Sequence, residues 1–249
     1  DFRWDLDFEI AYNKNWLTGF GEGVTVTKSN YSGVSQVYHD GGQLATWYLR
    51  EYAGVDPQTG RNTYIDANGN KTFDYASARY IEAGSPIIPW QGGLSTALSW
   101  KNFKLSATSN FVWGNQLYGR SRASELATWV GNSLLPSNED KIWRRPGDIA
   151  TIGSPAYAPA TLYHTGYLVR GDYFKIRNIT LSYSLPKSIM KDKGLTISLS
   201  CDNAATFTTV WGGDPEVDMT GSGIIGTIEG IDDRYPNKRQ YLMQVNFTF

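Results

Sequence analysis

The sequence is poor in the residues that build metal and redox sites. It has one cysteine, Cys201, so neither an internal disulfide nor a multi-cysteine metal site can form. Its two histidines, His39 and His164, lie far apart and lack a matching carboxylate motif, which argues against a catalytic zinc site. The sequence therefore predicts no metal ion and no cofactor.

Charge of one sign and long apolar runs are also missing. The chain has 23 Lys and Arg against 24 Asp and Glu, which argues against a broad basic surface for nucleic acid. No apolar run reaches the roughly 18 residues of a membrane helix. A membrane-barrel strand needs only about 9–11 residues, of which alternate ones face lipid, so that class stays open. No signal peptide is found at Asp1, and we expect either a removed leader or a missing N-terminal part.

Aromatic residues and glycine are abundant. The chain has nine Trp, sixteen Tyr, ten Phe and 26 Gly. Strands, turns and the aromatic belts at membrane surfaces use these residues, whereas helical bundles do not need them. The composition therefore favours an all-β fold.

The last segment, 239–249, predicts a strand between two different environments. One face carries the apolar residues and the other the polar ones, with Leu242 as the exception: Tyr241, Met243, Val245, Phe247 and Phe249 against Gln244, Asn246 and Thr248. A soluble sandwich could contain such a strand, but outer-membrane barrels end on one, and the assembly machinery recognises it. We predict that Tyr241, Phe247 and Phe249 form this C-terminal assembly signal, and that Phe249 is the barrel's own C-terminus.

Similar alternation predicts about seven strands in all. Their ranges are 1–12, 42–52, 91–100, 103–117, 172–185, 194–207 and 240–249. A further hairpin is expected within 61–75, around Asn68–Gly69. A closed single-chain barrel normally has an even number of at least about eight strands, so we expect part of a larger barrel. Cys201 then falls among the lipid-facing residues as an apolar filler.

The first strand carries charge on one face. Asp5, Asp7 and Glu9 alternate with apolar residues, and Lys104 takes a similar place later. These charges would be costly in a soluble core but cost little in a water-filled lumen, where they could line a polar path or simply form hydrated wall.

The barrel hypothesis also predicts an orientation. With a periplasmic C-terminus, Lys101–Asn102 and Pro186–Gly194 are periplasmic turns, and long outer loops lie near 118–171 and 208–239. If successive predicted strands alternate in direction back from the C-terminus, the segment 13–41 would fall on the periplasmic side.

Several motifs together resemble a known family. They are Gly171 to Pro186 (GDYFKIRNITLSYSLP), Gly212 to Val217 (GGDPEV), Trp143 to Asp148 (WRRPGD), and Trp90 to Gly93 (WQGG). Taken in chain order, and over nearly the whole chain, they are similar to the C-terminal region of SusC/RagA-type TonB-linked outer-membrane proteins. The element Asn203 to Thr208 departs from the family's wording at two positions.

This resemblance implies an antiparallel transmembrane β-barrel of about 22 strands, of which residues 1–249 are the C-terminal portion. The plug domain and the TonB box of such proteins are not in this sequence. The resemblance further implies an importer of glycan fragments or peptides in the outer membrane. Its implied partners are a SusD-like surface lipoprotein and TonB, the latter reached through the missing N-terminal part.

The sequence offers no catalytic site. No nucleophile motif is present, and Asp214 and Glu216 are interpreted as a solvated turn rather than a catalytic pair. The candidates for ligand contact are aromatic residues of the expected outer loops, because their rings stack on sugars and their polar atoms form hydrogen bonds: Trp143, Tyr157, Tyr163, Tyr167 and Trp211. Packing of the loops, or an outer aromatic belt, would explain the same residues.

Two other functions remain open at this point. One is a small complete outer-membrane barrel that serves as an adhesin or anchor, and an even strand count would favour it. The other is a soluble carbohydrate-binding β-sandwich, which leaves the aromatic C-terminal strand unexplained.

Overall fold

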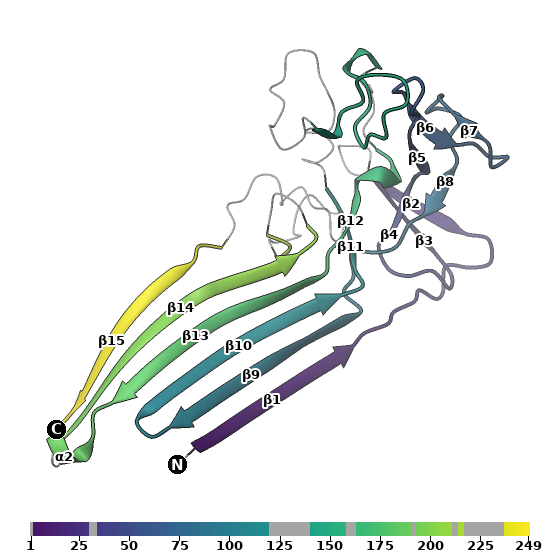
Figure 1. Ribbon diagram of the computed structural model, residues 1–249. Coiled ribbons are helices and arrows are strands. Elements are labelled where there is room, and N and C mark those ends of the chain that lie inside the picture. The colour runs from purple at the N-terminus through teal and green to yellow at the C-terminus, as the bar shows by residue number, and fades with distance from the viewer. Residues whose placement is uncertain are drawn as a thin grey trace.

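A computed structural model describes residues 2–29, 34–119, 140–157, 163–190, 193–210, 214–216 and 237–249. Its main feature is one antiparallel sheet of six long strands in the order β1-β9-β10-β13-β14-β15 (Figure 1). The strands are β1 (Phe2–Tyr12), β9 (Trp90–Trp100), β10 (Phe103–Trp113), β13 (Tyr173–Ser184), β14 (Gly194–Thr208) and β15 (Gln240–Thr248). The sheet is open: within the described residues, β1 and β15 are its edges and it does not close into a barrel.

The six-stranded sheet has one apolar and one polar face. Directly opposed residues share a face, so the register of neighbouring strands defines each face. The apolar face includes Trp4 beside Leu98, Leu98 beside Leu105, and Leu105 beside Leu181. It continues through Leu199 to Met243. The polar face carries Ser, Thr, Asn and Gln on the inner strands and Asp5, Asp7 and Glu9 on β1. The alternation predicted for these strands is confirmed.

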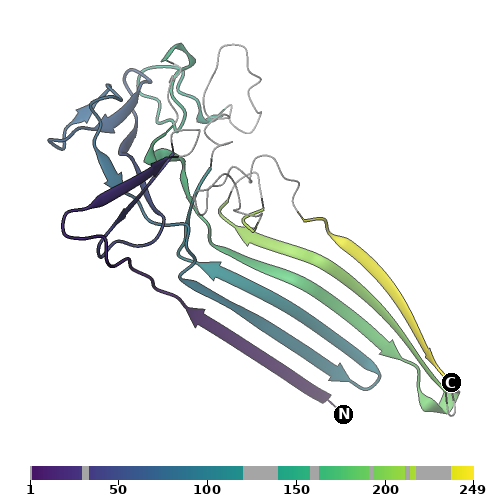
Figure 2. The ribbon, with the colours of Figure 1, turned by 180° about the vertical axis from the view of Figure 1, so that it is seen from behind.

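Both ends of the chain lie at one end of this sheet, here called the turn end (Figures 1 and 2). The tight turn Lys101–Asn102 joins β9 to β10 there, as predicted. The short α2 (Lys187–Met190) lies in the connection from β13 to β14. No helix in the described part of the chain is long and apolar enough to cross a membrane.

Residues at the opposite end fold into what we call the loop unit: the described residues of 13–89, 114–119 and 140–172 (Figure 2). It contains three small sheets. Their strands are β2 (Thr25–Ser29), β3 (Ser35–His39), β4 (Thr46–Arg50), β8 (Tyr80–Glu82), β5 (Tyr52–Val55), β6 (Asn62–Ile65), β7 (Lys71–Thr72), β11 (Gln116–Tyr118) and β12 (Leu168–Arg170). The predicted hairpin around Asn68–Gly69 is the β6–β7 pair.

Two predictions near the N-terminus are wrong. The segment 42–52 is not a long strand of the main sheet, because β4 pairs with β3 and β8 inside the loop unit. Consequently β1 pairs directly with β9, and the described residues of 13–41 lie at the end opposite the turn Lys101–Asn102. Trp47 and Leu49 alternate as in a barrel strand, but they do so to fill a local core.

That core is the main buried cluster of the described residues. Trp47 and Leu49 are almost fully buried and pack with Val34, Tyr118 and Tyr167. Burial of a large apolar side chain contributes about 1.5–3 kcal/mol, so this cluster holds the small sheets together. The six-stranded sheet, by contrast, leaves its large apolar side chains exposed; Trp4, Phe8 and Met243 have exposed fractions of 59%, 60% and 68%.

Candidate functional site

A β-bulge in β13 determines which side chains lie on the polar face near the loop unit; we call this end of the sheet the loop end. The register against both β10 and β14 skips Arg177. Because an extra residue reverses which side chains face which side, Lys175 falls on the polar face while Ile179 stays on the apolar one. Without the bulge, Lys175 would lie on the apolar face together with Ile179. The bulge instead brings the cations Lys175 and Arg177 to the polar side.

These cations bind two carboxylates from the connection that follows β14. Lys175 Nζ pairs with Asp214 Oδ1, and lies 2.8 Å from Glu216 Oε2. The Arg177 guanidinium pairs with Glu216 Oε1. We call Lys175, Arg177, Asp214 and Glu216 the ionic cluster. Its two positive and two negative charges balance, which offsets the cost of taking them out of water.

Neighbouring side chains complete the hydrogen bonding of the ionic cluster. Arg177 Nε donates to Asn110 Oδ1 at 2.7 Å, and the Tyr173 hydroxyl donates to Glu216 Oε1 at 3.2 Å. Lys175 and Asp214 have side-chain exposures of 4% and 6%. The arrangement anchors residues 214–216 to the polar face of the sheet.

A second cluster surrounds His164 in the loop unit. Its ring stacks between Tyr52 and Tyr167, with ring centroids at 4.3 and 4.2 Å. Nδ1 accepts a hydrogen bond from Gly166 N at 3.1 Å. Burial lowers the pKa of His164 to about 3, so the ring is neutral near pH 7. His164 therefore packs as a neutral ring between Tyr52 and Tyr167.

The five predicted ligand contacts occupy different environments. Tyr167 is buried in the core and Tyr163 packs against it. Trp143 lies flat against Gly60, where an added Cβ would meet its ring at 2.4 Å, and its indole Nε1 donates to Pro57 O. Tyr157 has an exposed fraction of 54%. Trp211 lies outside the described residues.

Tyr157 and Phe73 are exposed aromatic residues of the loop unit that share one cation. The Arg61 guanidinium carbon lies 4.4 Å from the Phe73 ring centroid and 5.6 Å from that of Tyr157. Such stacked cations hold aromatic side chains in place while their outer faces remain open.

The predicted assembly-signal residues lie on β15 or directly after it. Tyr241 and Phe247 are on the apolar face, opposite Cys201 and Leu195 of β14. Phe249 follows the strand, and its ring meets that of Phe247 edge to face at 4.7 Å.

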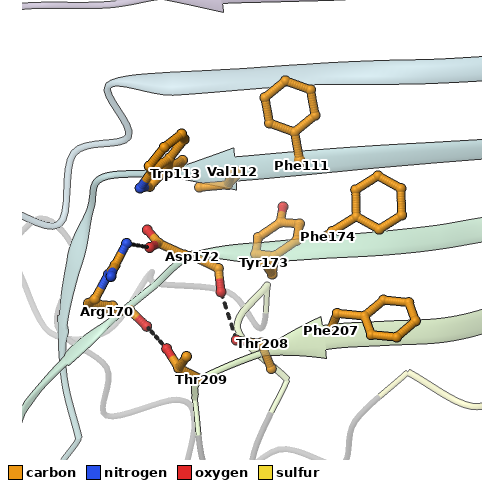
Figure 3. Close-up of a pocket in the computed structure, with 10 residues that line it drawn as sticks. All are labelled: Phe111, Val112, Trp113, Arg170, Asp172, Tyr173, Phe174, Phe207, Thr208 and Thr209. Atoms are coloured by element: carbon orange, nitrogen blue, oxygen red, sulfur yellow. Dashed lines mark hydrogen bonds and ion pairs between the residues drawn. The ribbon is translucent and has the colours of Figure 1, made fainter.

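The apolar face is hollowed at its loop end. A pocket of about 450 Å³ lies over β10, β13 and β14 (Figure 3). Phe111, Phe174 and Phe207 lie in one row across these strands. The ion pair of Arg170 and Asp172 borders the pocket on the side nearer the loop unit.

Comparison with known proteins shows which receptors the chain resembles. No family model matches the chain. TonB-dependent receptor P3 of Formosa agariphila is 25% identical over the whole chain, which covers 27% of that receptor. TonB-dependent receptor P39 of the same organism is 28% identical over 75% of the chain and 18% of its own length. TonB-dependent receptor SusC of Bacteroides thetaiotaomicron is 25% identical over the whole chain and 25% of its own length.

The chain is homologous to part of the SusC/RagA TonB-dependent receptors. It spans about a quarter of their length. The fold agrees: the RagAB peptide importer in its open-open state superposes over the whole chain with a TM-score of 0.78 at 22% identity, covering 27% of that structure. Its closed-closed state gives 0.77 at 23% identity. The relatives in this homology are TonB-dependent receptors, which are outer-membrane transporters and not enzymes.

The interpretation of Asp214 and Glu216 as a solvated turn is wrong. Asp214 is buried, because it pairs with Lys175 about forty residues earlier in the chain. The sequence does contain a signal for the bulge: on β13 the apolar positions change from odd to even numbers between Ile179 and Ile176. That change predicts an extra residue and a cation turned to the polar side.

Proposed function

We propose that the chain forms six neighbouring wall strands and part of the outer loops of a SusC-like TonB-dependent importer. The observation that carries this proposal is the apolar face of the sheet. Large apolar side chains cover it on every strand with exposed fractions of about one half or more at many positions, such as Leu6 at 56% and Leu199 at 54%. A water-soluble protein rarely exposes so continuous an apolar surface, whereas a barrel wall in lipid requires one.

The remaining barrel wall would come from strands of the longer chain. Within the described residues β1 and β15 each pair on one side, and unpaired strand edges are costly in hydrocarbon. Further strands would join both edges and close the barrel around the polar face. The charges of Asp5, Asp7 and Glu9 would then face a water-filled lumen.

The proposed orientation puts the turn end and the C-terminus in the periplasm. Short connections at the turn end and long ones at the loop end match the usual asymmetry of such barrels. The loop unit would lie outside the cell, where a SusD-like lipoprotein would cover it. TonB would act through the part of the protein that precedes this chain, and the assembly machinery would recognise Tyr241, Phe247 and Phe249.

The proposed cargo is peptides or glycan fragments. The solved relatives are a peptide importer, and the exposed rings of Tyr157 and Phe73 beside Arg61 could stack on a sugar or receive a peptide side chain. Trp143, Tyr163, Tyr167 and Trp211 would support the loops around this contact surface.

Purification of the native protein from outer membranes in mild detergent tests this function. Mass spectrometry of the complex should find peptides of the longer receptor and a co-purifying surface lipoprotein. Binding of mixed peptides and of oligosaccharides to that complex would then separate the two cargo classes. Recovery of the protein in the soluble fraction, without a lipoprotein, would contradict the proposal.

A further inference from the structure

We propose that the apolar face carries a binding site for a membrane lipid with an anionic phosphate headgroup. The site is the pocket at the loop end of β10, β13 and β14 (Figure 3). This inference rests on the proposed function, because only a sheet embedded in the membrane presents its apolar face to lipid.

The lower part of the pocket is a row of aromatic rings. Phe111 lies opposite Phe174, and Phe174 lies opposite Phe207, on three neighbouring strands. Phe8 extends the row, since its ring stacks with that of Phe111 at a centroid distance of 6.2 Å. The row crosses the strands at one level of the sheet and gives an acyl chain a continuous apolar surface.

The apolar surface continues beyond the first pocket. A second pocket, of about 560 Å³, shares Phe111 and Trp113 with the first and extends toward Ile10 and Trp90. The two pockets adjoin at Phe111 and Trp113 on the apolar face. Each is far larger than an inorganic phosphate needs, which favours an amphipathic ligand over a free anion.

A polar rim borders the aromatic row on the side nearer the loop unit. The Arg170 guanidinium pairs with Asp172, whose other carboxylate oxygen accepts from Gly114 N at 2.7 Å. The Thr209 hydroxyl donates to Arg170 O at 3.4 Å, and the Thr208 hydroxyl donates to Asp172 O at 2.8 Å. These contacts hold the start of β13, the end of β14 and the residue Arg170 together at the mouth of the pocket.

Arg170 has donors left for an anion. A guanidinium carries five N–H groups, and the side chain of Arg170 is 64% exposed although it pairs with Asp172. Arginine binds phosphate oxygens through two parallel hydrogen bonds, a geometry that lysine cannot offer. Trp113, at the same level, is 60% exposed and has the amphipathic ring typical of membrane surfaces.

The order of these groups matches the order of groups in a lipid. Going from the loop unit toward the turn end, the pocket presents the Arg170–Asp172 ion pair beside the Trp113 indole, and then the phenyl rings (Figure 3). A phosphate at Arg170 would place its acyl chains over Phe174 and Phe207. The lipid would fill the junction between the wall strands and the loop unit.

Native mass spectrometry of the full-length receptor tests the site. The receptor is reconstituted into vesicles of phosphatidylcholine and phosphatidylglycerol in equal amounts, then released, and the retained lipids are counted. The intact receptor should retain phosphatidylglycerol preferentially. Arg170→Gln should lower its retention about tenfold relative to phosphatidylcholine, as expected for the loss of one charge-assisted contact.

Matched variants separate the headgroup contact from other effects. Arg145, which pairs with Asp148 on the loop unit, is a matched control, and Arg145→Gln should leave lipid retention unchanged. Phe207→Ala should lower the retention of both lipids equally. If Arg170→Gln fails to fold, Arg170→Lys, which keeps the charge but not the paired hydrogen bonds, should show a partial loss.

Three outcomes would overturn the site: equal retention of both lipids by the intact receptor, unchanged retention in the Arg170 variants, or displacement of phosphatidylglycerol by millimolar inorganic phosphate. Each can occur in a receptor that is found in the outer membrane. Absence of the receptor from that membrane would instead refute the proposed function, and this site with it.

Discussion

At the scale of single residues, the bulge at Arg177 has the largest structural consequence. One extra residue turns Lys175 to the polar face and brings Arg177 within reach of Asn110 and Glu216. Residues 214–216 are thereby fixed to the sheet by charge. Breaking a buried pair on one side is strongly unfavourable, because the remaining charge has lost its partner.

Lys175→Met should release residues 214–216 from the sheet. The substitution keeps most of the side-chain volume but leaves Asp214 without its cation, at a cost of about 3 kcal/mol. Hydrogen–deuterium exchange of the full-length receptor should show much faster exchange in this segment. The double variant Lys175→Met, Asp214→Leu should restore part of the protection, whereas Lys101→Met, at an exposed turn, should change nothing. Unchanged exchange in the single variant would refute the anchoring role.

His164 should make the loop unit sensitive to acid. Its folded pKa of about 3 lies below the unfolded value, so the unfolded state binds a proton that the folded state does not. Stability is therefore complete above about pH 6.5 and falls by up to about 1.4 kcal/mol per pH unit as the pH drops toward 3.

Proteolysis of the loop unit between pH 7 and pH 4 measures this effect. His164→Phe, which keeps a ring between Tyr52 and Tyr167, should weaken the dependence on pH. His39→Gln is the control: hydrogen bonds to Asp40 O and Glu82 raise the pKa of His39, so its contribution is present at low pH and is lost as the pH rises. Equal acid sensitivity of the His164 variant and the unsubstituted receptor would contradict the prediction.

At the scale of elements, Gly92 determines how closely β1, β9 and β10 approach. A Cβ at this position would lie 2.2 Å from Glu9 O and 2.6 Å from the Phe111 ring. The absence of a side chain lets Phe111 lie across β9 toward Phe8. A glycine inside a strand often marks such a close approach.

Gly92→Ala should destabilise the pairing of β1 with β9 by about 1–3 kcal/mol, since neither neighbour can move freely. Gly93→Ala is the matched control, because its Cβ would meet mainly the flexible carboxylate of Glu9, at 2.9 Å. The difference should appear in the denaturant concentration that unfolds each variant. Equal stability of the two variants would show that the strands adjust without cost.

Alternation of apolar and polar residues predicts some of the strands but not their partners. The long strands 103–113 and 240–248 are predictable from the sequence. Each has one apolar and one polar face, so apolar and polar residues alternate along it. The segment 46–50 alternates for a different reason, namely the local core around Trp47, and alternation cannot tell which strand a segment pairs with. The ionic cluster was missed because it joins residues 175 and 214, and distant charges leave no periodic signal.

At the scale of the whole molecule, the chain divides into a two-faced sheet and a loop unit with its own core. The sheet has few buried residues, and the loop unit holds most of them. A sheet without a buried side gains little from water exclusion, whereas lipid can cover its apolar face. We therefore propose that the apolar face lies against the membrane.

Two arginine substitutions at adjacent positions of β13 test this claim most directly. Leu181→Arg introduces a charge on the apolar face, opposite Leu105 and Leu199, and Ser182→Arg introduces it on the polar face. The amount of folded receptor in outer membranes is measured for both. We predict a large loss for Leu181→Arg, which costs about 2–4 kcal/mol in hydrocarbon, and a near-normal amount for Ser182→Arg. Equal amounts of both variants, or a gain in soluble protein with Leu181→Arg, would contradict the account.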